Sequence, residues 1–205
     1  NAIEPHAVTL YWRDGELYMH DASQAVDHVA WTVADVFALS EDKVHVTSPY
    51  VGGGFGAKVL WSHQILAAAA SKMANRPVRM TLSREGVYRT VGGRAQTEQT
   101  VALGADTNGR LVALCHTGTV VKSGHNALPE PFILSAQSSY ATPSMLLDVQ
   151  VATLDVLANT FMRAPGEAVG SFALESAMDE LAERIGLDPV ELRLRNEPEK
   201  DPVKG

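Results

Sequence analysis

The sequence has little cysteine, no long apolar run and no cluster of basic residues, and each shortage excludes a class of protein. Cys115 is the single cysteine among the 205 residues. Because an iron–sulfur cluster normally takes four cysteine ligands, this chain alone cannot hold one. The longest apolar stretch, residues 65–70, is far shorter than the roughly 20 residues that a membrane helix needs. The sequence therefore predicts no iron–sulfur centre and no membrane span.

Charge and histidine spacing exclude two further classes. Lys and Arg number 17 against 24 Asp and Glu, and a net charge of −7 without any basic run argues against nucleic acid as a partner. The seven histidines are scattered, without a zinc-binding spacing such as H-E-x-x-H. We therefore expect no metal ion bound directly by side chains. No secretory leader is recognisable, and the compartment stays unknown, with the cytoplasm preferred and the periplasm as the alternative.

What the sequence does have is a glycine-rich loop before an apolar helical segment. Residues 50–58 read YVGGGFGAK, with four glycines around Phe55. Glycine reaches positive φ cheaply, so such a loop can bring its amides up to a ligand at the start of a helix. A strand-to-helix turn is the structural alternative. A Walker A loop is excluded because Val59, not Ser or Thr, follows Lys58, and a dinucleotide fingerprint is excluded because residues 71–75 hold no carboxylate.

A second loop of this kind lies near the carboxyl end. Residues 159–170 read NTFMRAPGEAVG and lead into a helix whose apolar residues recur at helical spacing: Leu174, Met178, Leu181 and Ile185. Pro165 and Gly166 are typical of a helix start.

The two loops together resemble the molybdenum-binding subunit of the xanthine dehydrogenase and aldehyde oxidase family. The matching segments are GGFGAK at 53–58, RAPGE at 163–167 with FALE at 172–175, NAIEPHA at 1–7 and DPVELRLRN at 188–196. The resemblance covers essentially all of the chain but only an inner part of the family's subunit. It implies that the chain is a fragment, that the family's catalytic glutamate lies outside it, and that no residue here is catalytic.

The resemblance implies molybdopterin as cofactor, in the cytosine dinucleotide form typical of bacterial members, with molybdenum held by the pterin sulfurs rather than by side chains. It places Gln24 within reach of an oxygen on molybdenum and the Phe55 loop near the metal. Without the family, Gln24 reads as an early helical residue after Ser23. Arg163 is expected to hold pterin or phosphate oxygens, with an ion pair to Glu167 as the alternative. The predicted cofactor-binding residues are Gln24, Gly53, Gly54, Phe55, Gly56, Arg163, Ala164 and Gly166.

Departures from the family's purine enzymes favour another substrate. Those enzymes have a glutamate where this chain has Val59 and an aromatic in the second loop, where this chain reads RAP at 163–165. The carbon-monoxide branch relies on a cysteine beside the metal, whereas Cys115 lies in an apolar strand and is expected in the core.

The resemblance thus implies a hydroxylase of aldehydes or heteroaromatic carbons. It would pass electrons to iron–sulfur and FAD partners, depend on the remainder of its subunit, and be inactive as this fragment. The alternative is a cofactor-free remnant or binding module of the same fold.

The element pattern predicts an α+β fold with mixed sheets, packed helices and a repeated strand-helix unit. We expect one cofactor-binding domain over 1–205, with two subdomains at about 1–85 and 86–205. Residues 123–140 lack a period and are predicted to be a long loop, either lining a site or inert. Helices are expected at 24–39, capped by Ser23, and after the glycine loop, carrying Leu60. Strands are expected at 7–12, 16–20, 43–50, 78–83, 96–103, 111–121 and 146–157.

Overall fold

The computed structural model describes residues 2–59, 61–125 and 128–202, so Asn1 of the amino-terminal motif and Leu60 of the predicted helix lie outside the described residues. The chain divides into two compact units. The first runs to Gly92 and also takes in Thr160–Met162, and the second holds Gly93–Asn159 and the residues from Arg163 onward. The subdomain division expected near residue 85 stays a prediction.

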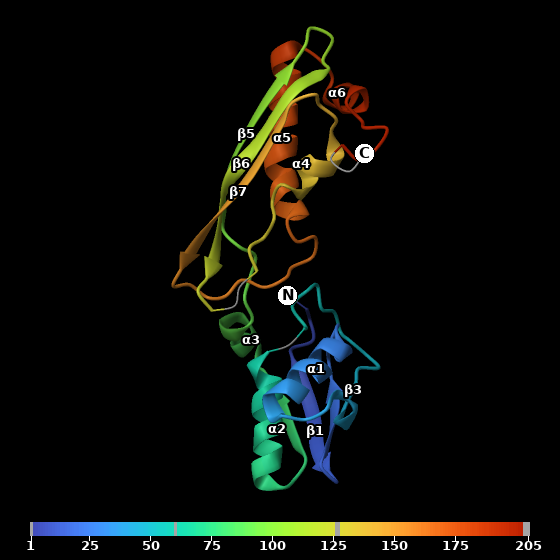
Figure 1. Cartoon of the computed structure of the whole chain (residues 1–205), viewed down its shortest axis with the longest axis vertical. Coiled ribbons are helices and arrows are strands. Elements are labelled where there is room, and N and C mark those ends of the chain that lie inside the picture. Colours follow the sequence, from blue (N-terminus) through green and yellow to red (C-terminus); the bar gives the residue numbers. More distant parts are fainter. Residues whose placement is uncertain (1, 60, 126–127, 203–205) are drawn as a thin grey trace. The chain divides into compact units, whose positions relative to one another are not determined.

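The first unit is a mixed sheet, in the order β3-β2-β1-β4, with helices packed on it (Figure 1). Strands β1 and β2 form the predicted hairpin, whose turn residues Asp14 and Gly15 have φ of 51° and 82°, and β3 runs parallel to β2. The elements of this unit are β1 (Ala7–Arg13), β2 (Glu16–Asp21), α1 (Val26–Phe37), η1 (Glu41–Lys43), β3 (Val44–Thr47), α2 (Ser62–Ala74), β4 (Val78–Thr81) and α3 (Arg84–Thr90).

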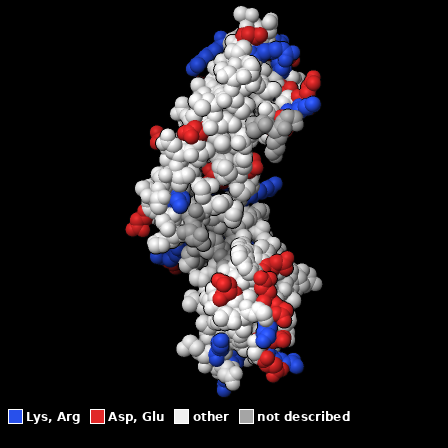
Figure 2. All heavy atoms as spheres, in the orientation of Figure 1, with Lys and Arg blue, Asp and Glu red and all other residues white. Residues whose placement is uncertain are grey.

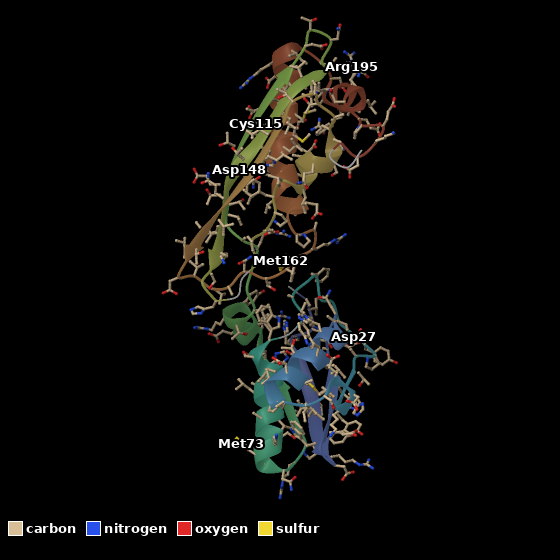
Figure 3. All side chains as sticks on the ribbon, viewed as in Figure 1. Asp27, Met73, Cys115, Asp148, Met162 and Arg195 are labelled. Carbon is tan, nitrogen blue, oxygen red and sulfur yellow. The ribbon has the colours of Figure 1, made fainter. Side chains whose placement is uncertain are left out.

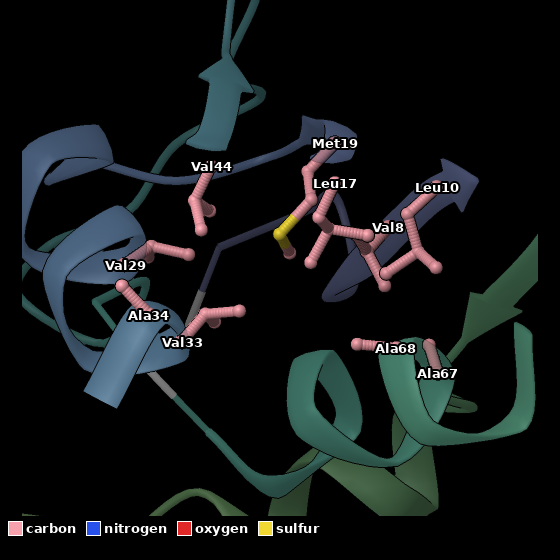
Figure 4. Close-up of a cluster of buried hydrophobic side chains, with 10 residues drawn as sticks. All are labelled: Val8, Leu10, Leu17, Met19, Val29, Val33, Ala34, Val44, Ala67 and Ala68. Carbon is pink, nitrogen blue, oxygen red and sulfur yellow. The ribbon is translucent and has the colours of Figure 1, made fainter. Parts of the chain in front are cut away.

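One apolar cluster joins this sheet to α1 and α2. The apolar side chains that alternate along β1 and β2 pack against the apolar side chains that recur every three or four residues along α1. Each element thus buries the face that its sequence pattern predicts. Each fully buried Leu or Val stabilises the fold by roughly 1.5–3 kcal/mol. The cluster in Figure 4 consists of Val8, Leu10, Leu17, Met19, Val29, Val33, Ala34, Val44, Ala67 and Ala68.

The second unit is a sheet in the order β5-β6-β7 with α4, α5 and α6 beside it (Figure 1). Strands β5 and β6 are antiparallel, and β7 runs parallel to β6. The elements are β5 (Thr97–Ala105), β6 (Leu111–Ser123), α4 (Leu134–Ser139), β7 (Met145–Leu154), α5 (Glu167–Ile185) and α6 (Pro189–Arg195). Its main cluster consists of Leu111, Leu114, Ala136, Tyr140, Leu174, Met178, Ala182 and Leu192.

Both units repeat one order of elements, as the sequence suggested in outline. In each, an antiparallel hairpin is followed by a helix and then by a strand parallel to the second hairpin strand: β1-β2-α1-β3 in the first unit and β5-β6-α4-β7 in the second. A loop then leads into a long helix, α2 or α5. The predicted α+β class is confirmed, and the glycine loop and the Arg163 loop stand at equivalent places in the two units.

Several predicted elements need correction. Helix α1 begins at Val26, and its cap Ala25 has no polar side chain, so the expected cap by Ser23 is wrong. The Ser23 hydroxyl instead accepts from the Ala25 amide and shares its one proton between the carbonyls of residues 58 and 59, each at 3.3 Å. Residues 123–140 are not a featureless loop, since they contain α4. Helix α3 was missed because it is short.

Cys115 is half-buried and free rather than part of the core. It lies on β6 of the second sheet, where it alternates with the buried Leu114 and His116, and Asp148 lies on the neighbouring β7 (Figure 3). The view in Figure 2 shows scattered Lys and Arg side chains on this face of the molecule rather than one continuous basic patch. Among the described residues, no helix has both the length and the apolar content to span a bilayer.

Candidate functional site

The glycine loop follows β3 and precedes α2, and it is held in an unusual backbone conformation. Gly53 and Gly56 have φ of 89° and 93°, and Phe55 between them has φ of 55°, a left-handed conformation that is an outlier for a bulky side chain. Phe55 is nevertheless 47% exposed, so burial of its ring does not account for the strain. Strain of this kind, of order 1–3 kcal/mol, persists where the surroundings fix it and clusters at functional sites.

Gln24 fixes the loop from the neighbouring chain segment. Its Oε1 accepts hydrogen bonds from the main-chain amides of Gly56 (3.0 Å) and Lys58 (3.2 Å). The main-chain amide of Gln24 donates to the Lys58 carbonyl (2.7 Å). With the carboxamide oxygen occupied by two donors, the Nε2 group is left to donate elsewhere. Gln24 precedes α1, so the alternative interpretation as an early helical residue is wrong.

An ion pair closes the other side of the loop. The Lys58 side chain is fully buried, and its Nζ lies 2.5 Å from Glu4 Oε2, which also accepts the amide of Gly52 at 2.7 Å. These bonds lower the pKa of Glu4, with the Lys58 hydrogen bond as the largest cause. The loop lysine is therefore neutralised inside the protein and is not free to bind an anion.

Buried ionisable groups pack behind the loop. His6 Nε2 donates to the Ala57 carbonyl at 2.8 Å, and its ring meets the His63 ring edge-on at 5.6 Å. Burial lowers the pKa of His63 to about 4 and also lowers that of His6. Burial raises the pKa of Asp21 to about 6, although Gln64 donates to this carboxylate at 2.7 Å. Near neutral pH both histidines are thus uncharged.

The segment leading to the second loop touches the glycine loop within the first unit. A Cβ on Gly56 would lie 2.5 Å from the Phe161 carbonyl oxygen and 3.2 Å from Met162 Cα. Gly56 is therefore required for this close backbone approach. Arg163 is the next residue in the chain.

The second loop is also strained, and a carboxylate–guanidinium pair holds it. Ala164 has φ of 59° and Gly166 has φ of 86°. The Arg94 guanidinium donates to the carbonyls of Arg163 (2.6 Å) and Ala164 (3.2 Å) and pairs with the buried Glu130. Glu130 accepts from the amides of Gly166 (3.1 Å) and Ala95 (3.2 Å).

The predicted site residues of this loop differ in what they leave accessible. The Arg163 side chain is exposed, and no ion pair joins it to Glu167 within the part of the chain that the structure describes. The Gly166 amide is engaged by Glu130, so this residue shapes the loop rather than offering a donor. Among the described residues, no hydrogen bond engages the amides of Gly53, Gly54, Phe55 and Ala164.

Sequence reasoning missed the residues that hold the two loops. Glu4 and Lys58 were quoted only as parts of motifs, Glu130 was included only as part of the predicted loop at 123–140, and Arg94 was not considered. Glu130 stands between Pro129 and Pro131, an unusual place for a residue that is 5% exposed, but a sequence pattern cannot reveal burial of that kind.

Comparison with known proteins identifies the family. The family model for the molybdopterin cofactor-binding domain matches residues 1–197. The chain belongs to the molybdopterin cofactor-binding domain family. This confirms the resemblance to molybdenum-binding subunits of the xanthine dehydrogenase and aldehyde oxidase type.

Individual relatives agree with this assignment. The domain is 37% identical, over 98% of its length, to the aldehyde oxidoreductase molybdenum-binding subunit PaoC of Escherichia coli K12, and 30% identical, over 89%, to an indole-3-acetaldehyde oxidase of Arabidopsis thaliana. The solved aldehyde oxidoreductase of Desulfovibrio gigas matches all of the chain with a TM-score of 0.90 at 26% identity. The chain spans only 28%, 14% and 24% of these three proteins, respectively.

Each of the two loops, taken by itself, has hydrogen-bond donors of the kind that an anionic pterin cofactor needs. The unengaged donors are the amides of Gly53, Gly54, Phe55 and Ala164 and the Gln24 Nε2. The carboxylates that bond to the loops, Glu4 and Glu130, are each paired with a cation. In the described part of the chain, no three His, Cys, Asp or Glu side chains are grouped to hold a metal ion.

Proposed function

We propose that this chain binds molybdopterin through its two strained loops, as part of a molybdenum hydroxylase that oxidises an aldehyde or a heteroaromatic carbon. The observation that carries the proposal is the pair of outliers Phe55 and Ala164, each with φ near 55–59° and each in a loop with unengaged amides. An exposed aromatic in strained backbone has no packing rationale, whereas a bound anion would use the amides that the strain presents.

Each proposed residue has a distinct task. Gln24 Nε2 would donate a hydrogen bond to an oxygen of the cofactor, and the amides of Gly53, Gly54 and Phe55 would offer it fixed dipoles that need no reorganisation. Arg163 supplies a permanent charge for pterin or phosphate oxygens, and the Ala164 amide donates beside it. Gly56 and Gly166 allow the close backbone packing that these positions demand. The amino terminus of α5 favours a negative charge nearby.

The cofactor, when bound, would supply two-electron oxidation with the new oxygen taken from water, so that an aldehyde and water become a carboxylic acid, two protons and two electrons. The proposed acceptors are iron–sulfur and FAD partners, because Cys115 cannot ligate a cluster alone. The catalytic glutamate is assigned to the remainder of the subunit, and the fragment alone is proposed to be inactive.

The aldehyde branch is favoured for two reasons. Val59 follows the loop lysine and offers no carboxylate to pair with a purine nitrogen. The E. coli and D. gigas relatives are both named aldehyde oxidoreductases. We propose the cytosine dinucleotide form of the pterin.

The proposal is tested on the full-length protein purified from a host that makes molybdopterin. We expect close to one molybdenum per polypeptide, release of cytidine monophosphate on acid hydrolysis, and reduction of an artificial electron acceptor with aldehydes but not with hypoxanthine. Protein that folds in this host without molybdenum would favour the cofactor-free remnant. Loaded protein that oxidises hypoxanthine faster than aldehydes would contradict the substrate assignment.

A further inference from the structure

We infer that Arg94 and Glu130 are positioning residues for the second loop: together they turn the loop carbonyls inward and leave the Ala164 amide facing outward. This inference rests on the proposed function, because the outward amide matters only if a ligand uses it. The name "clasp" is used below for the Arg94–Glu130 pair.

The clasp contacts the loop at consecutive backbone groups. Arg94 Nη2 donates to the Arg163 carbonyl, Arg94 Nη1 donates to the Ala164 carbonyl, and Glu130 Oε1 accepts from the Gly166 amide. Pro165, between them, has no amide to satisfy. Charged hydrogen bonds of this kind are about twice as strong as neutral ones. The clasp therefore specifies the backbone of residues 163–166.

The direction of the Ala164 amide follows from these bonds. In a trans peptide the carbonyl of one residue and the amide of the next point in opposite directions. The structure has no cis peptide in its described residues, so the Ala164 N–H points away from Arg94 when the Arg163 carbonyl points toward it. The left-handed φ of Ala164 then brings its carbonyl back to the same guanidinium. This strained arrangement needs a cause, and the two donors of Arg94 provide it.

The segment that supports the clasp is closely packed. A Cβ on Gly166 would overlap the Pro131 carbonyl, and a Cβ on Gly170 would overlap the Phe132 carbonyl, so the segment after Glu130 packs directly on the loop and on the first turn of α5. Phe132 is fully buried against Ala95 and Val120. The backbone of Glu130 is thus anchored by the two residues that follow it.

A matched pair of variants separates positioning from general stabilisation. Glu130→Gln and Arg94→Lys each weaken the clasp but keep the size of the side chain, and Lys cannot reproduce the guanidinium fork that reaches two carbonyls. Arg94 borders a cavity of about 240 Å³, which gives a Lys side chain room. Glu175→Gln is the control, because it weakens another Arg–carboxylate pair of the same unit, with Arg193 at 2.6 Å, which joins α5 to α6 and not to residues 163–166.

The first readout needs no cofactor. In full-length protein from a host lacking molybdopterin, we expect amide exchange of a peptide covering residues 160–167 to be roughly tenfold or more faster in Glu130→Gln and Arg94→Lys, as the loss of a charged hydrogen bond implies. Glu175→Gln should lower the melting temperature without changing exchange of this peptide. If Glu130→Gln fails to fold, the amide exchange of Arg94→Lys alone tests the inference.

The second readout is molybdenum per polypeptide after expression in a molybdopterin-producing host. We expect at least a severalfold loss in both clasp variants and none in Glu175→Gln. Unchanged loop exchange in the clasp variants, or equal metal loss in Glu175→Gln at an equal fall in melting temperature, would overturn the inference. Wild-type protein without molybdenum would refute the proposed function instead, and the exchange readout would still test the clasp.

Discussion

The carboxamide of Gln24 occupies the space that a side chain on Gly54 would need. A Cβ on Gly54 would overlap the Cδ and Oε1 of Gln24, the same oxygen that accepts the amides of Gly56 and Lys58. The glycine at this position thus has a steric reason, although its φ is not positive. The glycine loop and Gln24 form one unit whose parts cannot vary independently.

Gly54→Ala is therefore expected to expel the Gln24 carboxamide and to break both of its hydrogen bonds to the loop. We expect a loss of about 1–3 kcal/mol in the free energy of unfolding, as for other overpacked sites, and a severalfold lower molybdenum content. Chemical denaturation and metal analysis of the full-length protein measure both. Gly93→Ala is the matched control, since a Cβ there meets nothing within 4 Å. Equal behaviour of the two variants would refute the steric account.

The Glu4–Lys58 pair should respond asymmetrically to removal of either partner. Glu4→Ala leaves the ammonium of Lys58 buried without a counter-ion, because the Lys58 side chain is 0% exposed while that of Glu4 is 38% exposed. We expect Glu4→Ala to cost about 3 kcal/mol or more of unfolding free energy and Lys58→Met clearly less. Urea denaturation of the two variants at pH 7 tests this, and the reverse order would contradict the burial argument.

Buried His63 and Asp21 should give opposing pH dependences between about pH 4 and pH 6. The pKa of His63 is lowered to about 4, so the unfolded chain binds the proton first and stability is lost as pH falls. The pKa of Asp21 is raised to about 6, so the folded chain binds its proton first and stability is gained as pH falls. We expect His63→Leu to make the stability loss between pH 6 and pH 4 shallower and Asp21→Asn to make it steeper. Parallel pH profiles for both variants and the wild type would contradict these assignments.

Asn196 should be a stability residue of the second unit with no role in the cofactor loops. Its Oδ1 accepts from the Leu111 amide at 2.8 Å, and its Nδ2 donates to the carbonyls of Gly109 and Leu192, both at 2.8 Å. Asn196→Ala leaves these buried groups unsatisfied, and we expect a loss of about 2–4 kcal/mol. The exposed neighbour variant Glu197→Ala should change stability by less than about 0.5 kcal/mol. If Asn196→Ala changed the free energy of unfolding as little as Glu197→Ala does, the three hydrogen bonds of Asn196 would contribute little to stability.

Sequence reasoning found the elements whose pattern matches their burial and missed what depends on long-range contacts. The hairpin around Asp14 and Gly15 follows from local turn chemistry, and α5 follows from its apolar spacing. The start of α1 was misplaced, because Ser23 bonds to residues 58 and 59, more than thirty positions away, rather than to its own helix.

In the candidate site, too, the local sequence patterns were predicted and the long-range contacts were not. The loops themselves were visible as glycine and proline patterns, and Gln24 was proposed only through the family resemblance. Arg94 and Glu130 are separated from the Arg163 loop by about 70 and 36 positions, and nothing in their local sequence marks them as partners. Cys115 was expected in the core because its strand is apolar, but the alternation along β6 places it on the less buried side.

The central claim, that both strained loops present main-chain donors to the cofactor, is tested most directly by residue-resolved amide exchange on full-length protein with and without its cofactor. The account predicts slower exchange on loading at Gly53, Gly54, Phe55 and Ala164, with little change at Gly56 and Gly166, whose amides already donate to Gln24 and Glu130. Protein that holds stoichiometric molybdenum yet shows unchanged exchange at those first four amides would contradict it.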